Sequence, residues 1–162
     1  MAQLVPQEIE FADTAPVTAE GAAVVTGTPE EVWAVLADHQ GWPSWFAGVK
    51  SCEATSEPAT GVGSTRRVVL AGGSRFEERF VAWDPAKRWA FTVTDMRPAA
   101  VRSLVERITI AELAPGRTRV TYRMAFDPKP WLKPVAPLLA RAMSANLTRA
   151  MTSLGRQVVE RR

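Results

Sequence analysis

Cysteine, histidine and tyrosine occur once each in these 162 residues. A lone Cys52 cannot form a disulfide within the chain, and residues 1–16 lack lysine, arginine and an apolar run of signal-peptide length, so we expect a cytoplasmic protein. A lone His39 is too little for the common imidazole zinc sites, and no nucleophile-elbow sequence surrounds a serine. We therefore expect no metal, no cofactor and no serine-hydrolase triad, and we expect His39 to cap a helix or lie at the surface.

Long apolar runs and runs of like charge are also missing. Charges or prolines interrupt each apolar stretch before it reaches the roughly 18 residues that a membrane span requires. The formal net charge is only +3, and the pI near 9.5 reflects arginines spread along the chain. We expect neither a membrane span nor a nucleic-acid partner, and the oligomeric state stays open. The glycines at 61–63 and 72–73 are typical of hairpin turns rather than of a phosphate loop.

The composition that is present is typical of a globular protein, with 46% hydrophobic and 23% charged residues. The chain length suits one domain with one core. We expect a single domain over residues 17–162, preceded by a flexible lead-in over residues 1–16 that could add a strand.

The domain begins with a predicted strand, which is followed by a sequence typical of a helix N-terminus. Residues 17–26 have the alternation of a strand, and Thr28 can then cap a helix that Pro29 begins. Glu31 lies three residues after Thr28 and completes a capping box. A second short helical turn is predicted across residues 42–46.

After Gly48 the hydrophobic pattern changes to a period of two and predicts a series of strands joined by short turns. Their expected ranges are 49–57, 64–71, 75–83, 88–96, 102–113 and 118–126. The apolar side chains of these strands point to one face of the sheet, and another element must bury that face. A final helix over residues 134–159 can bury it, because its apolar residues recur every three or four positions and form one apolar side. This stripe consists of Val135, Leu139, Met143, Leu147, Met151, Leu154 and Val158.

Three segments resemble the START-like, helix-grip (SRPBCC) superfamily in its polyketide cyclase/dehydrase branch: TPEEVWAVLADHQGWPSWFAGVKSCE (28–53), FEERFVAWDPAKRWAFTV (76–93) and GRTRVTYRMAFDPKPWLKPVAPLLARAM (116–143). The resemblance covers roughly residues 17–160. It implies an α+β helix-grip fold, in which a curved seven-stranded antiparallel β-sheet wraps around a long C-terminal helix, with two short helices between strands 1 and 2. The family contains ligand carriers and cyclases, so the resemblance predicts the fold more securely than the function.

The resemblance further implies a cavity between the sheet and the long helix. Trp45 and Phe46 would form its mouth, and Trp42 and Trp45 could gate it. The walls would come from Phe80, Phe91, Ile108, Tyr122, Met124, Leu139, Met143 and Leu147. Such a concave and mostly apolar site suits a small hydrophobic molecule, for example a lipid or a polyketide.

Two acids and the tyrosine lie among apolar residues on the inner face of the predicted strands. Desolvation would raise the pKa of Glu78 or Glu106, and either could then act as a general base or a hydrogen-bond donor. The alternative is a bulge that turns one of them outward, or a salt bridge to an arginine such as Arg67. Tyr122 could bond to a ligand or to the backbone, and Asn146 could reach the cavity or face water.

These patterns are compatible with functions of different classes. The first is the binding of a small hydrophobic ligand, which requires no catalytic group. The second is a cyclase, aromatase or dehydratase in which Glu78, Glu106 or Tyr122 moves protons. The third is an interaction protein that uses a sheet edge or the Trp-rich segment. The sequence does not decide whether the protein is an enzyme.

Overall fold

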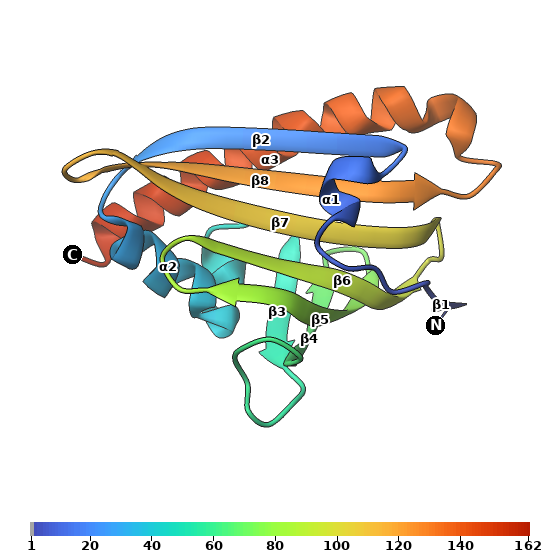
Figure 1. Cartoon of the computed structure of the whole chain (residues 1–162), viewed down its shortest axis with the longest axis horizontal. Helices are drawn as coiled ribbons and strands as arrows, with labels where there is room; N and C mark the ends of the chain where they lie inside the picture. The colour runs from blue at the N-terminus through green and yellow to red at the C-terminus, as the bar shows by residue number, and fades with distance from the viewer. Residues whose placement is uncertain (1) are drawn as a thin grey trace.

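The computed structural model describes residues 2–162 and shows a curved antiparallel sheet with a long helix across it (Figure 1). The sheet has the order β2-β8-β7-β6-β5-β4-β3, and β1 pairs only with β6. The strands are β1 Ala2–Gln3, β2 Val17–Thr26, β3 Val49–Ala54, β4 Thr65–Leu70, β5 Arg75–Asp84, β6 Arg88–Arg97, β7 Val101–Ala114 and β8 Arg117–Pro128. The helices are α1 Phe11–Thr14, α2 Pro29–Ala37, α3 Ala136–Glu160 and the 3₁₀ segments η1 His39–Ser44 and η2 Lys133–Val135. The predicted seven-stranded sheet, with two short helices after its first strand, is confirmed.

The helix start predicted at Thr28 is present in full. The Thr28 hydroxyl accepts from the Glu31 N–H at 3.3 Å, and the Glu31 carboxylate accepts from the Thr28 N–H at 2.8 Å. The short helical turn predicted at 42–46 is instead a 3₁₀ helix that begins at His39. At the last helix, Pro137 lies in the first turn, where its missing N–H interrupts no helical hydrogen bond.

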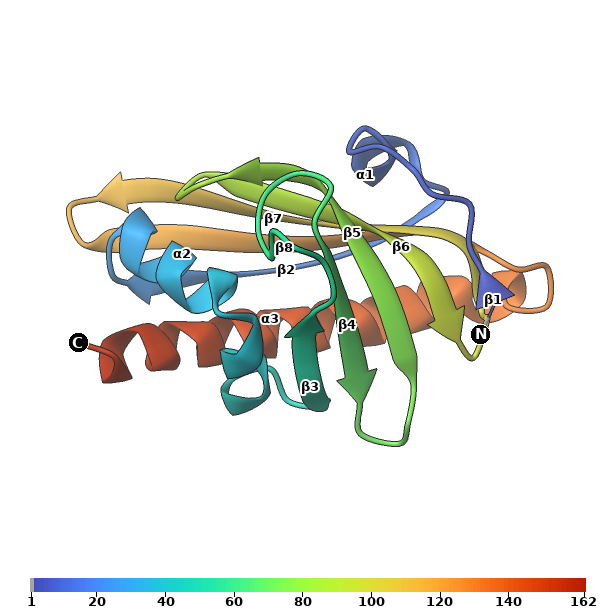
Figure 2. The ribbon, with the colours of Figure 1, turned by 90° about the horizontal axis from the view of Figure 1, so that it is seen from below.

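α3 crosses the inner face of the sheet and makes its closest approach at β2 (Figure 2). A Cβ at Gly21 would lie 2.2 Å from the backbone nitrogen of Thr148, so a larger residue would force the helix and the strand apart. Towards its C-terminal end, the helix buries Met151, Leu154 and Val158 in the core. This end of α3 therefore belongs to the packed interior.

The N-terminal segment packs against the sheet. β6 pairs with β7 only over Arg88–Thr92, and beyond this point the two strands separate. The Leu4 N–H donates to the Thr94 carbonyl at 3.0 Å, and the Val5 N–H donates to the Arg102 carbonyl at 2.9 Å. The segment thus fills the gap between β6 and β7 and satisfies backbone groups that the divergence would leave unpaired.

α1 covers part of the outer face of β7 and β8 (Figure 1). Ala12 is buried there against Val105 and Ala125. The Arg107 guanidinium donates to both carboxylate oxygens of Asp13, at 2.7 and 2.8 Å. These contacts give the sheet a small buried patch on its outer face as well.

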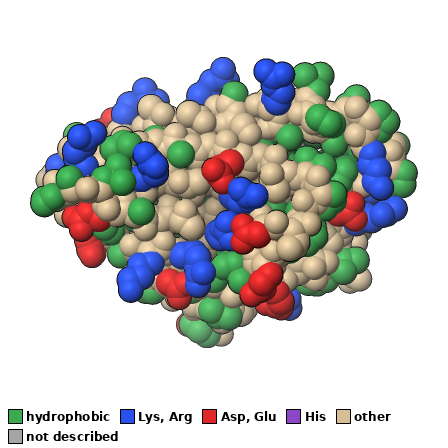
Figure 3. All heavy atoms as spheres, turned by 45° about the horizontal axis from the view of Figure 1, so that its top comes forward, with side chains coloured by type: hydrophobic (Ala, Val, Ile, Leu, Met, Phe, Trp, Pro, Cys, Tyr) green, Lys and Arg blue, Asp and Glu red, His purple; other side chains and the backbone are tan. Residues whose placement is uncertain are grey.

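The surface mixes charges of both signs. Figure 3 shows basic and acidic side chains interspersed over one face, with apolar side chains between them. Within the described part of the chain, no helix combines the length and the apolar character that crossing a membrane demands.

Candidate functional site

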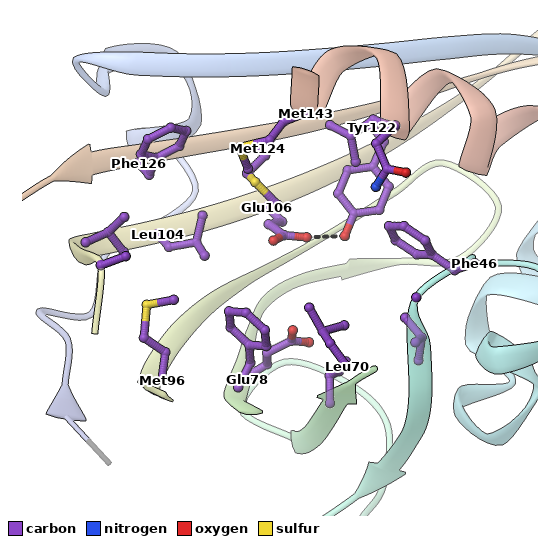
Figure 4. Close-up of a pocket in the computed structure, with 18 of the residues that line it drawn as sticks. Phe46, Leu70, Glu78, Met96, Leu104, Glu106, Tyr122, Met124, Phe126 and Met143 are labelled. Carbon is purple, nitrogen blue, oxygen red and sulfur yellow. Dashed lines mark hydrogen bonds between the residues drawn. The ribbon is translucent and has the colours of Figure 1, made fainter. Parts of the chain in front are cut away.

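An internal cavity of about 490 Å³ lies between the sheet and the N-terminal half of α3 (Figure 4). Apolar side chains of β4 to β8 form its walls, and Met143 and Leu147 of α3 close the opposite side. Exposed residues at its rim come from separate elements: Gly48 before β3, Ala71 after β4, and Leu139 in α3. The cavity is therefore a space between the helix and the curved sheet that opens to solvent between these three segments.

The structure brings many of the residues predicted for the cavity together. Those that line it are Phe46, Glu78, Glu106, Tyr122, Met124, Leu139, Met143, Asn146 and Leu147. Asn146 is exposed and lies at the rim, so both alternatives considered for it hold in part. Wall residues that the sequence analysis did not assign to the cavity include Leu70, Phe76, Met96, Leu104 and Phe126.

Trp45, Phe80, Phe91 and Ile108 do not line the cavity, contrary to expectation. All four are buried in the packed part of the interior. The Trp45 ring lies 4.8 Å from the Trp42 ring, so it is covered rather than placed at a mouth. Alternation shows which side chains point inward, but it does not show which of them pack against other side chains and which line a cavity.

A buried ion pair lies in the polar part of the cavity, and its arginine is not the one that the sequence analysis named. Arg66 Nε donates to Glu78 Oε2 at 2.5 Å, and the two side chains are 0% and 6% exposed. The register explains this partner, because Arg66 lies opposite Glu78, whereas the predicted partner Arg67 pairs with Glu77. A signal was present in the sequence, since Arg66 alternates in phase with the buried Val68.

Aromatic rings surround the Arg66 guanidinium. Its Cζ lies 4.1 Å from the ring centroid of Trp42, 4.7 Å from that of Phe91 and 5.1 Å from that of Trp89. Burial acts to lower the pKa of Arg66, but its interactions with Glu78, Cys52 and Tyr122 together keep the pKa above its usual value. Arg66 is therefore a buried cation, held between one carboxylate and a cage of rings.

The His39 side chain is buried next to Arg66, and it neither caps a helix nor lies at the surface. Its Nδ1 is 3.4 Å from Arg66 Nη1, and its ring stacks on Trp89 with 6.1 Å between the centroids. Burial, followed by the charge of Arg66, lowers the pKa of His39 to about 4, so the ring is neutral at pH 7. Within residues 2–162, no group of three or more His, Cys, Asp or Glu side chains is placed to hold a metal ion.

Glu106 and Tyr122 form the second buried polar pair. The Tyr122 hydroxyl donates to Glu106 Oε2, and Figure 4 shows this bond at the cavity wall. Burial raises the pKa of Glu106 to about 8, and the charge of Glu78 adds to the rise. Burial also raises the pKa of Glu78, but Arg66 opposes this rise. Arg66 hydrogen-bonds to Glu78 and not to Glu106, and a pKa of about 8 leaves the Glu106 carboxyl group mostly protonated at pH 7.

A curved antiparallel sheet that encloses an apolar cavity against a long C-terminal helix defines the helix-grip class of proteins. Within this class, residues 16–159 match the family described as polyketide cyclase / dehydrase and lipid transport, and the chain belongs to that family. The predicted membership is confirmed.

Relatives agree with this assignment at the level of sequence and fold. Proteins of Mycobacterium tuberculosis and Mycobacterium bovis, both described as uncharacterized, are 34% identical over 117 residues, which is 72% of this chain and 70% of theirs. A START superfamily protein from Mycobacterium smegmatis superposes with a TM-score of 0.75 at 14% identity, covering 90% of this chain and 99% of its own. An aromatase/cyclase from a Streptomyces species gives a TM-score of 0.71 at 19% identity, covering 89% and 94%. At such identities the two structures share the fold, which does not transfer an activity.

Proposed function

We propose that the protein binds one small, predominantly apolar molecule, such as a lipid or a polyketide, in the cavity between its sheet and α3. The observation that carries this proposal is a cavity of about 490 Å³ with mostly apolar walls and a few polar groups among its lining residues. Ligand sites in proteins have this character and a volume of roughly 300–1,000 Å³. The family supports hydrophobic-ligand binding or a cyclase role in general terms.

Native mass spectrometry of the protein purified from its own host tests the proposal. We expect a bound mass that disappears on denaturation and is recovered in an organic extract. Binding of the neutral fluorophore N-phenyl-1-naphthylamine gives a second measurement that needs no natural guest. If neither a co-purified guest nor fluorophore binding were found, the proposal would fail.

A matched pair of variants in α3 locates the binding. Met143→Trp places a larger side chain in the cavity, whereas Leu138→Trp places it on the same helix at a position that is 72% exposed. We expect Met143→Trp to lose the guest and the fluorophore, and Leu138→Trp to keep both. Equal binding by the two variants would place the ligand elsewhere.

Cyclase or dehydratase chemistry is the second candidate, and the two acids favour it. Glu106, whose pKa is raised by burial, and Glu78, which is paired with a cation, face one cavity, and acid–base catalysis uses buried carboxyl groups whose pKa values are raised in this way. Glu106→Gln keeps the hydrogen bond to Tyr122 but cannot transfer a proton. Retained ligand affinity with lost turnover supports an enzyme, whereas unchanged binding and turnover removes Glu106 from the chemistry.

A further inference from the structure

The charged groups that a guest would meet in the cavity are carboxyl groups, although an arginine borders it. The Arg66 side chain has no exposed surface, and its Nη2 is buried without a hydrogen-bond partner beside the Trp42 ring. Glu78 and Glu106 keep 5% and 7% exposure, and Figure 4 shows both carboxyl groups directed into the cavity. The carboxyl groups are thus accessible from the cavity, while the guanidinium is covered.

The charges of Arg66, Glu78 and Glu106 do not balance when both carboxyl groups are ionised. Among residues 2–162, Arg66 of β4 is the cation whose charge acts on Glu106, against the carboxyl group of Glu78 on β5. Tyr122 of β8 supplies a neutral hydroxyl, and α3 contributes the uncharged Asn146 to the cavity. One positive charge therefore faces two acids, and a cation in the cavity would complete the balance.

We propose that the guest is an apolar amine, with a hydrocarbon body along the cavity walls and one protonated amino group bound between the carboxylates of Glu78 and Glu106. This inference rests on the proposed function and specifies the chemical class of its ligand. The ring of Phe46, 6.0 Å from that of Tyr122, adds an aromatic side chain to the cavity wall on the Tyr122 side. A fatty-acid anion is disfavoured, because it would bring a further negative charge next to two buried acids.

Binding of such a guest is coupled to the release of a proton. In the free protein Glu106 carries the proton, and an entering ammonium group favours the ionised carboxylate. The Glu106 O–H bond breaks, the electron pair stays on the carboxylate, and the proton leaves to the solvent. Because the pKa of Glu106 is about 8, the affinity for an amine increases with pH up to about this value and then levels off.

Isothermal titration calorimetry with three ten-carbon probes tests this inference on the full chain. Decylamine, 1-decanol and decanoate share the hydrocarbon body and differ only in the head group. At pH 7 we expect decylamine to bind at least about tenfold more tightly than decanoate. Titrations in buffers of different ionisation enthalpy should show the release of about one proton per amine, and the Kd should fall by up to about tenfold per pH unit between pH 6 and 8.

Two variants serve as the matched pair for this experiment. Glu106→Gln should remove the proton release and the pH dependence, while Glu112→Gln, at the exposed end of the same strand, should leave both unchanged. If Glu106→Gln fails to fold, the proton release of the unmodified protein still decides the matter. Decanol or decanoate binding as tightly as decylamine, or decylamine binding at pH 7 without proton release, overturns the inference and leaves the proposed function standing. Failure of all three probes to bind also overturns the inference, while the co-purified guest and the fluorophore decide the proposed function separately.

Discussion

The two halves of α3 carry the same apolar repeat but have different surroundings. Met151, Leu154 and Val158 in the C-terminal half are 0%, 0% and 2% exposed and pack into the core. In the N-terminal half, Leu139 is 37% exposed and Met143 is half-buried, and both line the cavity. The repeat decides which face of the helix is apolar, whereas the shape of the sheet decides whether that face meets other side chains or a hollow.

The same difference divides the sheet into a packed end and a hollow end. At the packed end, the Phe80 ring lies 4.7 Å from Trp83 and 5.0 Å from Trp89, with Arg66 enclosed beside this cluster. At the hollow end, β6 and β7 have separated and Leu104 lines empty space. The buried ion pair of Arg66 and Glu78 lies where the two ends meet.

Breaking this ion pair should have the largest effect. Arg66→Met leaves the Glu78 carboxyl group buried without its cation, and we expect the free energy of unfolding to fall by about 3–5 kcal/mol in urea titrations. The double variant Arg66→Met/Glu78→Met removes both charges and should recover part of the loss. A double variant that is less stable than Arg66→Met would show that the charges themselves stabilise the packed end.

Truncating each half of α3 tests the comparison directly. Leu154→Ala creates a cavity in the packed end and should cost about 3 kcal/mol, while Met143→Ala enlarges an existing space and should cost less than about 1.5 kcal/mol. Both are measured by urea unfolding of the ligand-free protein. Equal losses would mean that the hollow end is as tightly packed as the other.

Truncating a side chain of the N-terminal segment, at the hollow end of the sheet, should lower stability by a smaller amount. Leu4 is 6% exposed and fills the gap between β6 and β7, so Leu4→Ala should lower the free energy of unfolding by about 2 kcal/mol. Val5→Ala is the control, because Val5 is 60% exposed and its truncation should change stability by less than about 0.5 kcal/mol. If the two variants were equally stable, the segment would contribute little to closing the sheet.

The smallest expected effect is a dependence of stability on pH from Glu106. Its pKa is raised from 4.5 to about 8 on folding, so the folded state binds the extra proton and stability falls as pH rises through this range. The lowered pKa of His39 acts in the opposite sense, with stability lost as pH falls from 6.5 to about 4. Between pH 6.5 and 8, where His39 is neutral in the folded state and loses its remaining charge in the unfolded state, its opposing contribution is small and the free energy of unfolding should fall by about 1 kcal/mol.

Urea unfolding at several pH values in that window measures the slope, and Glu106→Gln should abolish it. Glu112→Gln is the control, since this exposed residue lies on the same strand outside the cavity. A slope that persists in Glu106→Gln would assign the titration to another group.

The regular elements could be predicted because their signals are local. The capping box of Thr28 and Glu31 involves neighbours in the sequence, and the strand predicted at 17–26 has those bounds in the structure. The inward direction of Glu78 and Glu106 followed from alternation alone. Their partners did not, because Arg66 and Tyr122 are brought to them by strand register.

The amino-acid sequence by itself determined the antiparallel strands, the striped helix and the placement of two acids on the inner face, because side-chain period and turn chemistry act over a few residues. The tertiary structure alone decided that Arg66 pairs with Glu78, that His39 is buried, and that one end of the interior is hollow. These features depend on strand register and sheet curvature, which join residues far apart in the chain, so the pattern within one segment does not reveal which partners meet.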